Sequence, residues 1–234
     1  MDFEKRKLVV SLYFPVFIIL VIWIIKISEV ILKENWSHLG VYPMKIEGLL
    51  GIVTSPLIHG DFNHLIANTG PLFILTLGLF YFYSKIAWRV FFLIYFITGI
   101  WVWFGAREAY HIGASGVVYG LAAFIGLSGI IRKNVQLTAI SFLVIFLYGG
   151  MIWGVLPIDP RISWEGHLSG AIAGLMLAYY FRKMGPPSDI RTWKEIDDSD
   201  VPDDENAYWK VTDQTMDNVQ ITYKEDKKDE PKTD

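Results

Sequence analysis

A serine and a histidine stand out in a sequence that carries few polar groups over long stretches. Ser115 follows Gly113-Ala114 and His167 follows Gly166, each at the start of a long apolar run. A serine hydroxyl is a poor nucleophile until an imidazole within about 3 Å can accept its proton. If the fold brings the two side chains together, they could act as nucleophile and general base in acyl transfer.

A second group of polar residues could stabilise the oxyanion that such an attack creates. His64 and Asn68 are four residues apart, so they share one face of a helix and can both offer side-chain donors. The backbone N–H of Ser115, at a helix N-terminus, could add a third donor. Tyr119 lies one turn after Ser115 on the same face and could pack against the imidazole of His167.

Glycines are spaced so that two helices could cross closely. Gly170 and Gly174 follow His167 at three and seven residues, on its helical stripe, and Gly116 and Gly120 form a second pair. Small residues four apart allow helix backbones to approach closely inside a membrane. A crossing at these glycines would make the serine and the histidine face one another.

The elements that hold these groups are predicted to be membrane-spanning helices. Of the 234 residues, 53% are hydrophobic and 19% are charged. A spanning helix needs roughly 20 mostly apolar residues. Uncharged runs cover 8–25, 65–84, 90–106, 109–131, 134–158 and 166–181. The last of these runs is slightly short for a spanning helix, and Arg182 and Lys183 can complete it by extending to the interface. We therefore expect an all-α, polytopic membrane helix bundle of six transmembrane helices over residues 1–183.

Charge separates this bundle from the C-terminal part of the chain. Residues 1–183 carry 14 Lys and Arg against 9 Asp and Glu, whereas residues 184–234 carry 7 against 15. The second segment also has four prolines and few aliphatic residues. We interpret 184–234 as an acidic, solvated and disordered cytoplasmic tail.

The basic residues that flank the spans predict their orientation. With the N-terminus in the cytoplasm, nine Lys and Arg fall in cytoplasmic connections and four or five in outer ones. Both termini are then cytoplasmic, and the helix starts bearing His64, Ser115 and His167 all lie on the outer side. The apolar loop over about 33–62 is expected to form short interfacial helices.

On these residues the sequence resembles the rhomboid family of intramembrane serine proteases, over about residues 45–183. The Trp-Arg pair that many rhomboids carry before the second span is replaced by Leu49-Leu50-Gly51. The resemblance rests on three motifs: His59-(x)4-His64-(x)3-Asn68, Gly113-Ala114-Ser115-Gly116-Val117-Val118-Tyr119 and Gly166-His167-(x)2-Gly170-(x)3-Gly174. It implies the six-helix form, Ser115 as nucleophile, His167 as base, His64 and Asn68 as oxyanion donors, Tyr119 stacked on the base, and a tight crossing at Gly170 and Gly174.

The activity that the resemblance implies is that of a serine endopeptidase. It would hydrolyse peptide bonds in or near transmembrane segments of membrane-protein substrates, within membrane lipid and from the extracytoplasmic side. No metal, cofactor or nucleic acid is expected to take part, and the sequence does not give the oligomeric state.

Other classes of function fit the sequence less well. A rhomboid-like protein that only binds transmembrane clients typically lacks the serine or the histidine, whereas this chain keeps both. A transporter tends to show internal repeats with interrupted helices, and none is evident. His59 and His64 are five residues apart and do not share a helix face, as a HExxH metal site requires. Asp61 and Asp159 both fall near span ends, so an aspartyl protease is not indicated. Glu165 stays open as a third catalytic member beside Ser115 and His167.

Overall fold

The computed structural model describes residues 3–159 and 162–185, and these residues form helices joined by short connections. Within them the only strand-like pairing is an isolated antiparallel bridge between Val41 and His111. The predicted tail over 184–234 lies outside the described residues except at positions 184 and 185. The α-helices are α1 Phe3–Leu32, α2 Gly51–Thr54, α3 Phe62–Phe82, α4 Ala87–Gly105, α5 Ser115–Arg132, α6 Val135–Tyr148 and α7 Trp164–Tyr180.

Five of these segments are long and apolar enough to cross a membrane: α1, α3, α4, α5, and α6 together with the 3₁₀ helix η4 (Gly149–Val155). Helix α7 has 17 residues, about 26 Å of helix, and the 3₁₀ helix η5 (Phe181–Lys183) continues it. It packs in the same bundle, against α4 and α5. The predicted all-α polytopic bundle is confirmed.

Polar residues cap the helices at the points where the chain turns. Asp61 caps α3 and accepts a hydrogen bond from the His64 backbone N–H at 2.8 Å. Asn134 caps α6 in the same way, 2.9 Å from the Leu137 N–H. Lys133, which ends α5, has a φ of 53°. This left-handed turn lets α6 begin two residues after α5 ends, so the two helices are antiparallel neighbours.

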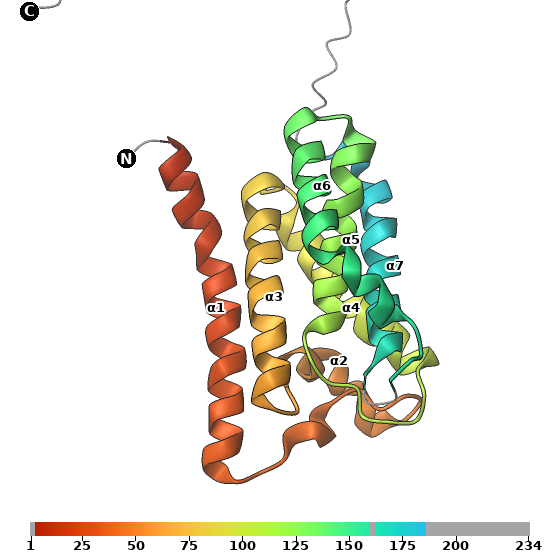
Figure 1. Ribbon diagram of the computed structural model, residues 1–234. Coiled ribbons are helices and arrows are strands. Elements are labelled where there is room, and N and C mark those ends of the chain that lie inside the picture. Colours follow the sequence, from red (N-terminus) through yellow and green to blue (C-terminus); the bar gives the residue numbers. More distant parts are fainter. Residues whose placement is uncertain (1–2, 160–161, 186–234) are drawn as a thin grey trace, which may run out of the picture. The chain divides into compact units, whose positions relative to one another are not determined.

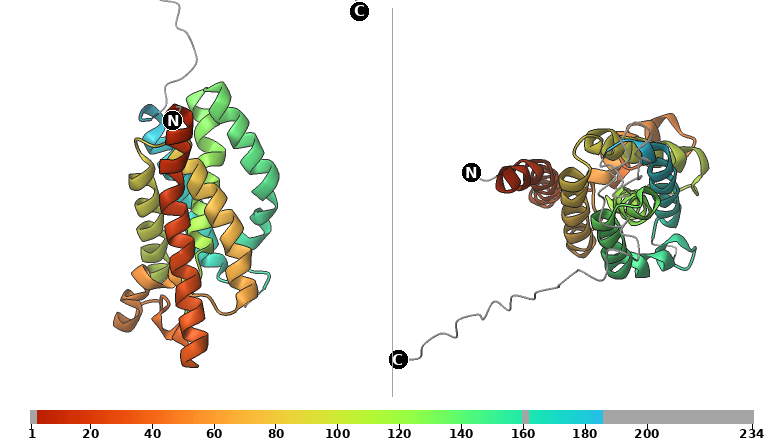
Figure 2. Two further views of the ribbon diagram at one scale, coloured as in Figure 1. Left: turned by 90° about the vertical axis from the view of Figure 1, so that its left-hand side faces the viewer. Right: turned by 90° about the horizontal axis from the view of Figure 1, so that it is seen from above.

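Helix α5 occupies the interior of the bundle. Its span has the largest buried share of the five, and it packs against α3, α4, α6 and α7. Viewed along the bundle, α5 is surrounded by the other helices, while α1 lies outside α3 (Figure 2). The site residues on α5 are therefore shielded from lipid on several sides.

Helices α3, α5 and α7 begin at the same end of the bundle, the lower end in Figure 1. The loop before α3 lies at this end. It contains α2 and three 3₁₀ helices: η1 Trp36–Leu39, η2 Ile46–Leu49 and η3 Ser55–Leu57. The short helices expected in this loop are present, and their depth in a membrane stays a prediction.

Helices α5 and α7 cross with almost no space between their backbones. A methyl group at Gly170 would lie 1.9 Å from the Gly116 carbonyl oxygen, and one at Gly174 would lie 2.1 Å from that of Gly120. A real Cβ does not tolerate such contacts, so only glycine fits at these two positions. The crossing brings the first turns of α5 and α7 side by side.

Candidate active site

Ser115 and His167 meet at the lower end of this crossing. Ser115 is the first residue of α5, and His167 lies in the first turn of α7. The Ser115 Oγ is 2.8 Å from the His167 Nε2, within hydrogen-bonding distance. The histidine is buried and the serine is half-buried, so the pair sits inside the bundle with one side open. An imidazole at this distance can take the hydroxyl proton.

The second nitrogen of the His167 ring bonds to the main chain. Its Nδ1 lies 2.8 Å from the carbonyl oxygen of Gly154, in η4. Because a carbonyl oxygen can only accept, Nδ1 carries the proton and Nε2 presents its lone pair to Ser115. Glu165, left open as a third member, instead pairs with Arg107 at 3.7 Å. A backbone carbonyl therefore orients the ring, and no side-chain pattern in the sequence could have identified it.

Tyr119 lies flat against the same imidazole. The two ring centroids are 4.2 Å apart and the ring planes differ by 9°. The Tyr119 hydroxyl donates a hydrogen bond to the Met151 carbonyl oxygen at 2.7 Å, again in η4. This short 3₁₀ helix thus holds both the histidine and the ring stacked on it, although the uncharged run over 134–158 does not separate it from the preceding span.

His64 and Asn68 approach the serine from α3. A methyl group at Gly113 would lie 2.6 Å from the His64 Cε1 and 2.7 Å from its Nε2, so the His64 ring packs directly on the turn that precedes Ser115. Gly113 has a φ of +106°, which also favours glycine there. Asn68 is buried and donates one of its two amide hydrogens to the His64 carbonyl oxygen at 2.9 Å.

These side chains share one cavity of about 730 Å³. Its walls combine the reactive pair with polar groups of α3 and with aromatic and apolar groups of α5 and α6. The lining includes His64, Asn68, Ser115, Tyr119, Tyr148 and His167. The polar residues that the sequence motifs singled out on three helices therefore lie around a single space.

His59 supports the site from behind. It is 1% exposed, and its ring packs edge-on to the His64 ring with centroids 5.0 Å apart. Its Nε2 lies 3.5 Å from the Ala114 backbone N–H. Burial lowers the pKa of His59 to about 4, so the ring is neutral at pH 7. The structure therefore places His59 behind the His64 ring, which lines the cavity.

His111, in the loop between α4 and α5, is buried and connects two segments of the site. Its Nε2 lies 3.0 Å from the Arg107 carbonyl oxygen, and its Nδ1 lies 2.6 Å from the Ser163 hydroxyl. Since the carbonyl requires a proton on Nε2, Nδ1 accepts from Ser163, the N-cap residue directly before α7. The ring joins the loop before Ser115 to the helix of His167.

The fold and this arrangement define a class, an integral multi-pass membrane protein with a hydrogen-bonded serine and histidine inside its helix bundle. The chain belongs to the rhomboid family: the model of the Rhomboid domain matches residues 47–184. That match begins after α1 and ends at the last described turn of the bundle.

Relatives among curated proteins are mycobacterial. Uncharacterized proteins of Mycobacterium bovis and Mycobacterium tuberculosis are each 36% identical to this chain over 154 residues, which cover 60% of this chain and 62% of the relative. An uncharacterized protein of Mycobacterium leprae is 31% identical over 191 residues, 74% of this chain and 72% of that protein. The chain thus aligns with less than two thirds of the length of the first two. No solved structure matches.

Proposed function

We propose that this protein is an intramembrane serine endopeptidase that hydrolyses peptide bonds in or near the transmembrane segments of other membrane proteins. The observation that carries the proposal is the 2.8 Å contact between the Ser115 Oγ and the His167 Nε2 inside the membrane bundle. Membership of the rhomboid family supports the reaction class. Two helices and a glycine crossing are needed to build that contact.

In the first step the Ser115 Oγ attacks the substrate carbonyl carbon while the His167 Nε2 takes the hydroxyl proton. The proton on Nδ1 stays bonded to the Gly154 carbonyl, which stabilises the imidazolium that forms. The tetrahedral intermediate then collapses, the C–N bond breaks, and His167 returns its proton to the leaving amine. An acyl ester on Ser115 remains.

The oxyanion of the intermediate requires donors on the opposite side of the serine. The His64 ring packs on the turn before Ser115, and Asn68 keeps one amide hydrogen for a further bond. With the Ser115 backbone N–H they form a set of three donors. Such a donor typically contributes about 10²–10³ in kcat.

Water completes the reaction. It attacks the acyl ester with His167 again as base, the acid product leaves, and the proton returns to the Ser115 Oγ.

The cavity holds polar groups at the end of the bundle where α3, α5 and α7 begin. The balance of basic residues puts this end on the extracytoplasmic side, with both termini in the cytoplasm. A transmembrane segment of a substrate would reach it laterally after local unwinding.

The test uses the purified full chain in lipid vesicles with a reporter protein that has one transmembrane segment. Wild type should produce two fragments, whereas Ser115→Ala and His167→Ala should produce none while keeping the wild-type unfolding temperature. Ser84→Ala, at an exposed turn between α3 and α4, serves as the matched serine control and should cleave normally. Cleavage at the wild-type rate by either site variant would refute the proposal. Reporter binding without cleavage by the wild type would instead favour a client-binding protein.

A further inference from the structure

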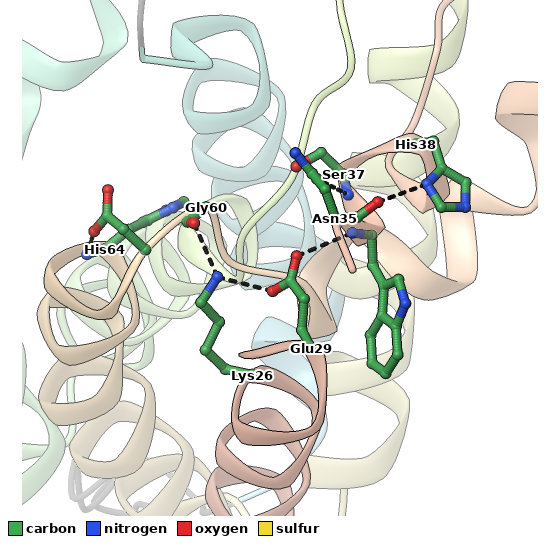
Figure 3. A network of polar contacts seen from close by, with 9 residues as sticks. Lys26, Glu29, Asn35, Ser37, His38, Gly60 and His64 are labelled. Atoms are coloured by element: carbon green, nitrogen blue, oxygen red, sulfur yellow. Dashed lines mark hydrogen bonds and ion pairs between the residues drawn. The ribbon is translucent and has the colours of Figure 1, made fainter. Parts of the chain in front are cut away.

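Helix α1 carries a buried ion pair that lies outside the part of the chain matched by the family model. Lys26 and Glu29 are 6% and 5% exposed, and the Lys26 Nζ lies 2.8 Å from the Glu29 Oε2 (Figure 3). Removing two charges from water costs several kcal/mol per ion, so such a pair is weak evidence for stability. A contribution to stability therefore does not explain why both charges are buried.

The pair does not merely hold α1 against the bundle. Apolar residues of α1 such as Ile22 already pack in the core, and the Trp23 Nε1 donates to the Thr69 Oγ1 of α3 at 3.1 Å. These contacts could dock the helix without any buried charge. The ion pair must therefore have a role other than packing α1 against the bundle.

Both partners of the pair bond to the backbone of the loop that leads to the site. The Lys26 Nζ donates to the Gly60 carbonyl oxygen at 2.9 Å, and the Glu29 Oε1 accepts from the Trp36 backbone N–H at 2.9 Å. Figure 3 shows the Lys26 side chain between Glu29 and Gly60. The pair thus fixes the first and the last part of this loop to the same turn of α1.

Gly60 stands directly before the start of the helix that carries the oxyanion donors. The next residue, Asp61, caps α3 through the His64 backbone N–H at 2.8 Å. The His64 ring packs on Gly113, and Asn68 follows one turn later, bonded to the His64 carbonyl. A shift of the Gly60 carbonyl would be transmitted through one residue to the first turn of α3.

We propose that Lys26 is a positioning residue for the oxyanion donors. Its ammonium group, held in place by Glu29, fixes the Gly60 carbonyl and with it the first turn of α3, which sets where His64 and Asn68 stand relative to Ser115. This inference rests on the proposed peptidase function, and it adds a helix that the family match does not include.

The test compares two buried residues of α1 in the vesicle assay. Lys26→Met removes the bond to Gly60, so kcat should fall about tenfold with KM within twofold, because oxyanion contacts form only in the transition state. Ile22→Ala removes core packing from the same helix without touching that bond. It should lower the unfolding temperature and leave kcat within twofold at a temperature where it is folded. An equal loss of kcat in both variants would overturn the proposal.

A double-mutant cycle gives a readout that a merely structural role would not move. Where His64→Ala has already removed a donor, Lys26→Met should cost less than half, on a logarithmic scale, of what it costs in the wild-type background. Full additivity would mean that Lys26 does not act through His64 and would overturn the proposal.

A second variant covers the case in which Lys26→Met leaves the Glu29 charge buried without its lysine and the protein does not fold. Lys26→Met/Glu29→Met removes both charges together and still lacks the Gly60 bond, so it should show the same loss of kcat. Wild-type turnover by this folded double variant would contradict the proposal. Ser115→Ala is measured in parallel: if it cleaves, the proposed function fails, and if it does not, only the role of Lys26 is at issue.

Discussion

At the scale of single residues, a main-chain carbonyl decides which nitrogen of His167 faces the serine. The Gly154 carbonyl holds the proton on Nδ1 and leaves Nε2 toward Ser115. Residue types at recognisable spacing could be predicted from the sequence, and His64, Asn68, Ser115, Tyr119 and His167 all lie around one cavity. The Gly154 contact could not, because any residue has a carbonyl.

The glycine at position 154 can be tested by adding one methyl group. A Cβ there would lie 2.0 Å from the Tyr119 hydroxyl and 3.2 Å from the His167 Nδ1. Gly154→Ala should therefore displace both rings and lower kcat by about 10²-fold, since a misplacement of 1 Å has that order of effect. Gly150→Ala is the matched control in the same 3₁₀ helix, because a Cβ there meets nothing within 4 Å. Equal rates of reporter cleavage in the two variants would refute this role of η4.

His59 predicts a pH dependence of stability. Its pKa is about 4 in the folded protein and about 6.5 when unfolded, so between these values the unfolded state binds more protons. The free energy of unfolding should fall as the pH is lowered from about 6.5 to about 4, by about 3 kcal/mol from this residue. Burial also lowers the pKa of His111, which adds to the fall.

Denaturation of the wild type, His59→Gln and His38→Gln across this pH range checks the expectation. The fall should be smaller in His59→Gln than in the wild type, and His38→Gln serves as a control that replaces an exposed histidine. A wild-type pH profile in His59→Gln would show that His59 is not the group responsible.

At the scale of elements, the crossing of α5 and α7 sets the distance between serine and histidine. It could be foreseen because close backbone approach requires small residues, and glycines four apart are visible in a sequence. The end of α6 could not be foreseen. An uncharged run over 134–158 suggests one helix, whereas the α-helix stops at Tyr148 and a 3₁₀ helix follows. Gly149 and Gly150 weaken helix formation there, but tertiary contacts with Tyr119 and His167 decide the geometry.

The crossing makes its own prediction. Gly170→Ala would place a methyl group 1.9 Å from the Gly116 carbonyl oxygen, and the helices must separate to admit it. We expect a destabilisation of about 1–3 kcal/mol or more and a loss of cleavage, measured by unfolding in detergent and by the vesicle assay. Gly78→Ala on α3 is the control, because its Cβ would make an ordinary 3.7 Å contact with Ile125. It should stay within about 1 kcal/mol of wild type, and an equal loss in both variants would contradict the account.

At the scale of the whole molecule, apolar length predicts the spans and the basic residues that flank them predict the orientation. Uncharged runs predicted the spans because water-free surroundings leave few alternatives to a helix. The role of α1 beyond spanning could not be predicted, since a charged Lys26 near the end of an apolar run reads equally well as an interfacial residue. Only the packed structure shows that it is buried and reaches the loop before α3.

The orientation itself can be measured with single cysteines, because the chain contains none. Glu34→Cys lies after α1, and Lys85→Cys lies between α3 and α4, both at exposed positions. With both termini in the cytoplasm, a membrane-impermeant maleimide should label Glu34→Cys in intact cells and Lys85→Cys only after permeabilisation. The reverse pattern would place the site on the cytoplasmic side.

The most direct test of the Ser115–His167 chemistry is the mass of the protein after reaction with a fluorophosphonate in lipid vesicles. The serine oxygen forms a bond to phosphorus and fluoride leaves, so one adduct per chain is expected, on the peptide that contains Ser115. Ser115→Ala should give no adduct, and His167→Ala should react far more slowly. Folded wild-type protein that stays unmodified, or an adduct on a different residue, would contradict the assignment of Ser115 as the nucleophile.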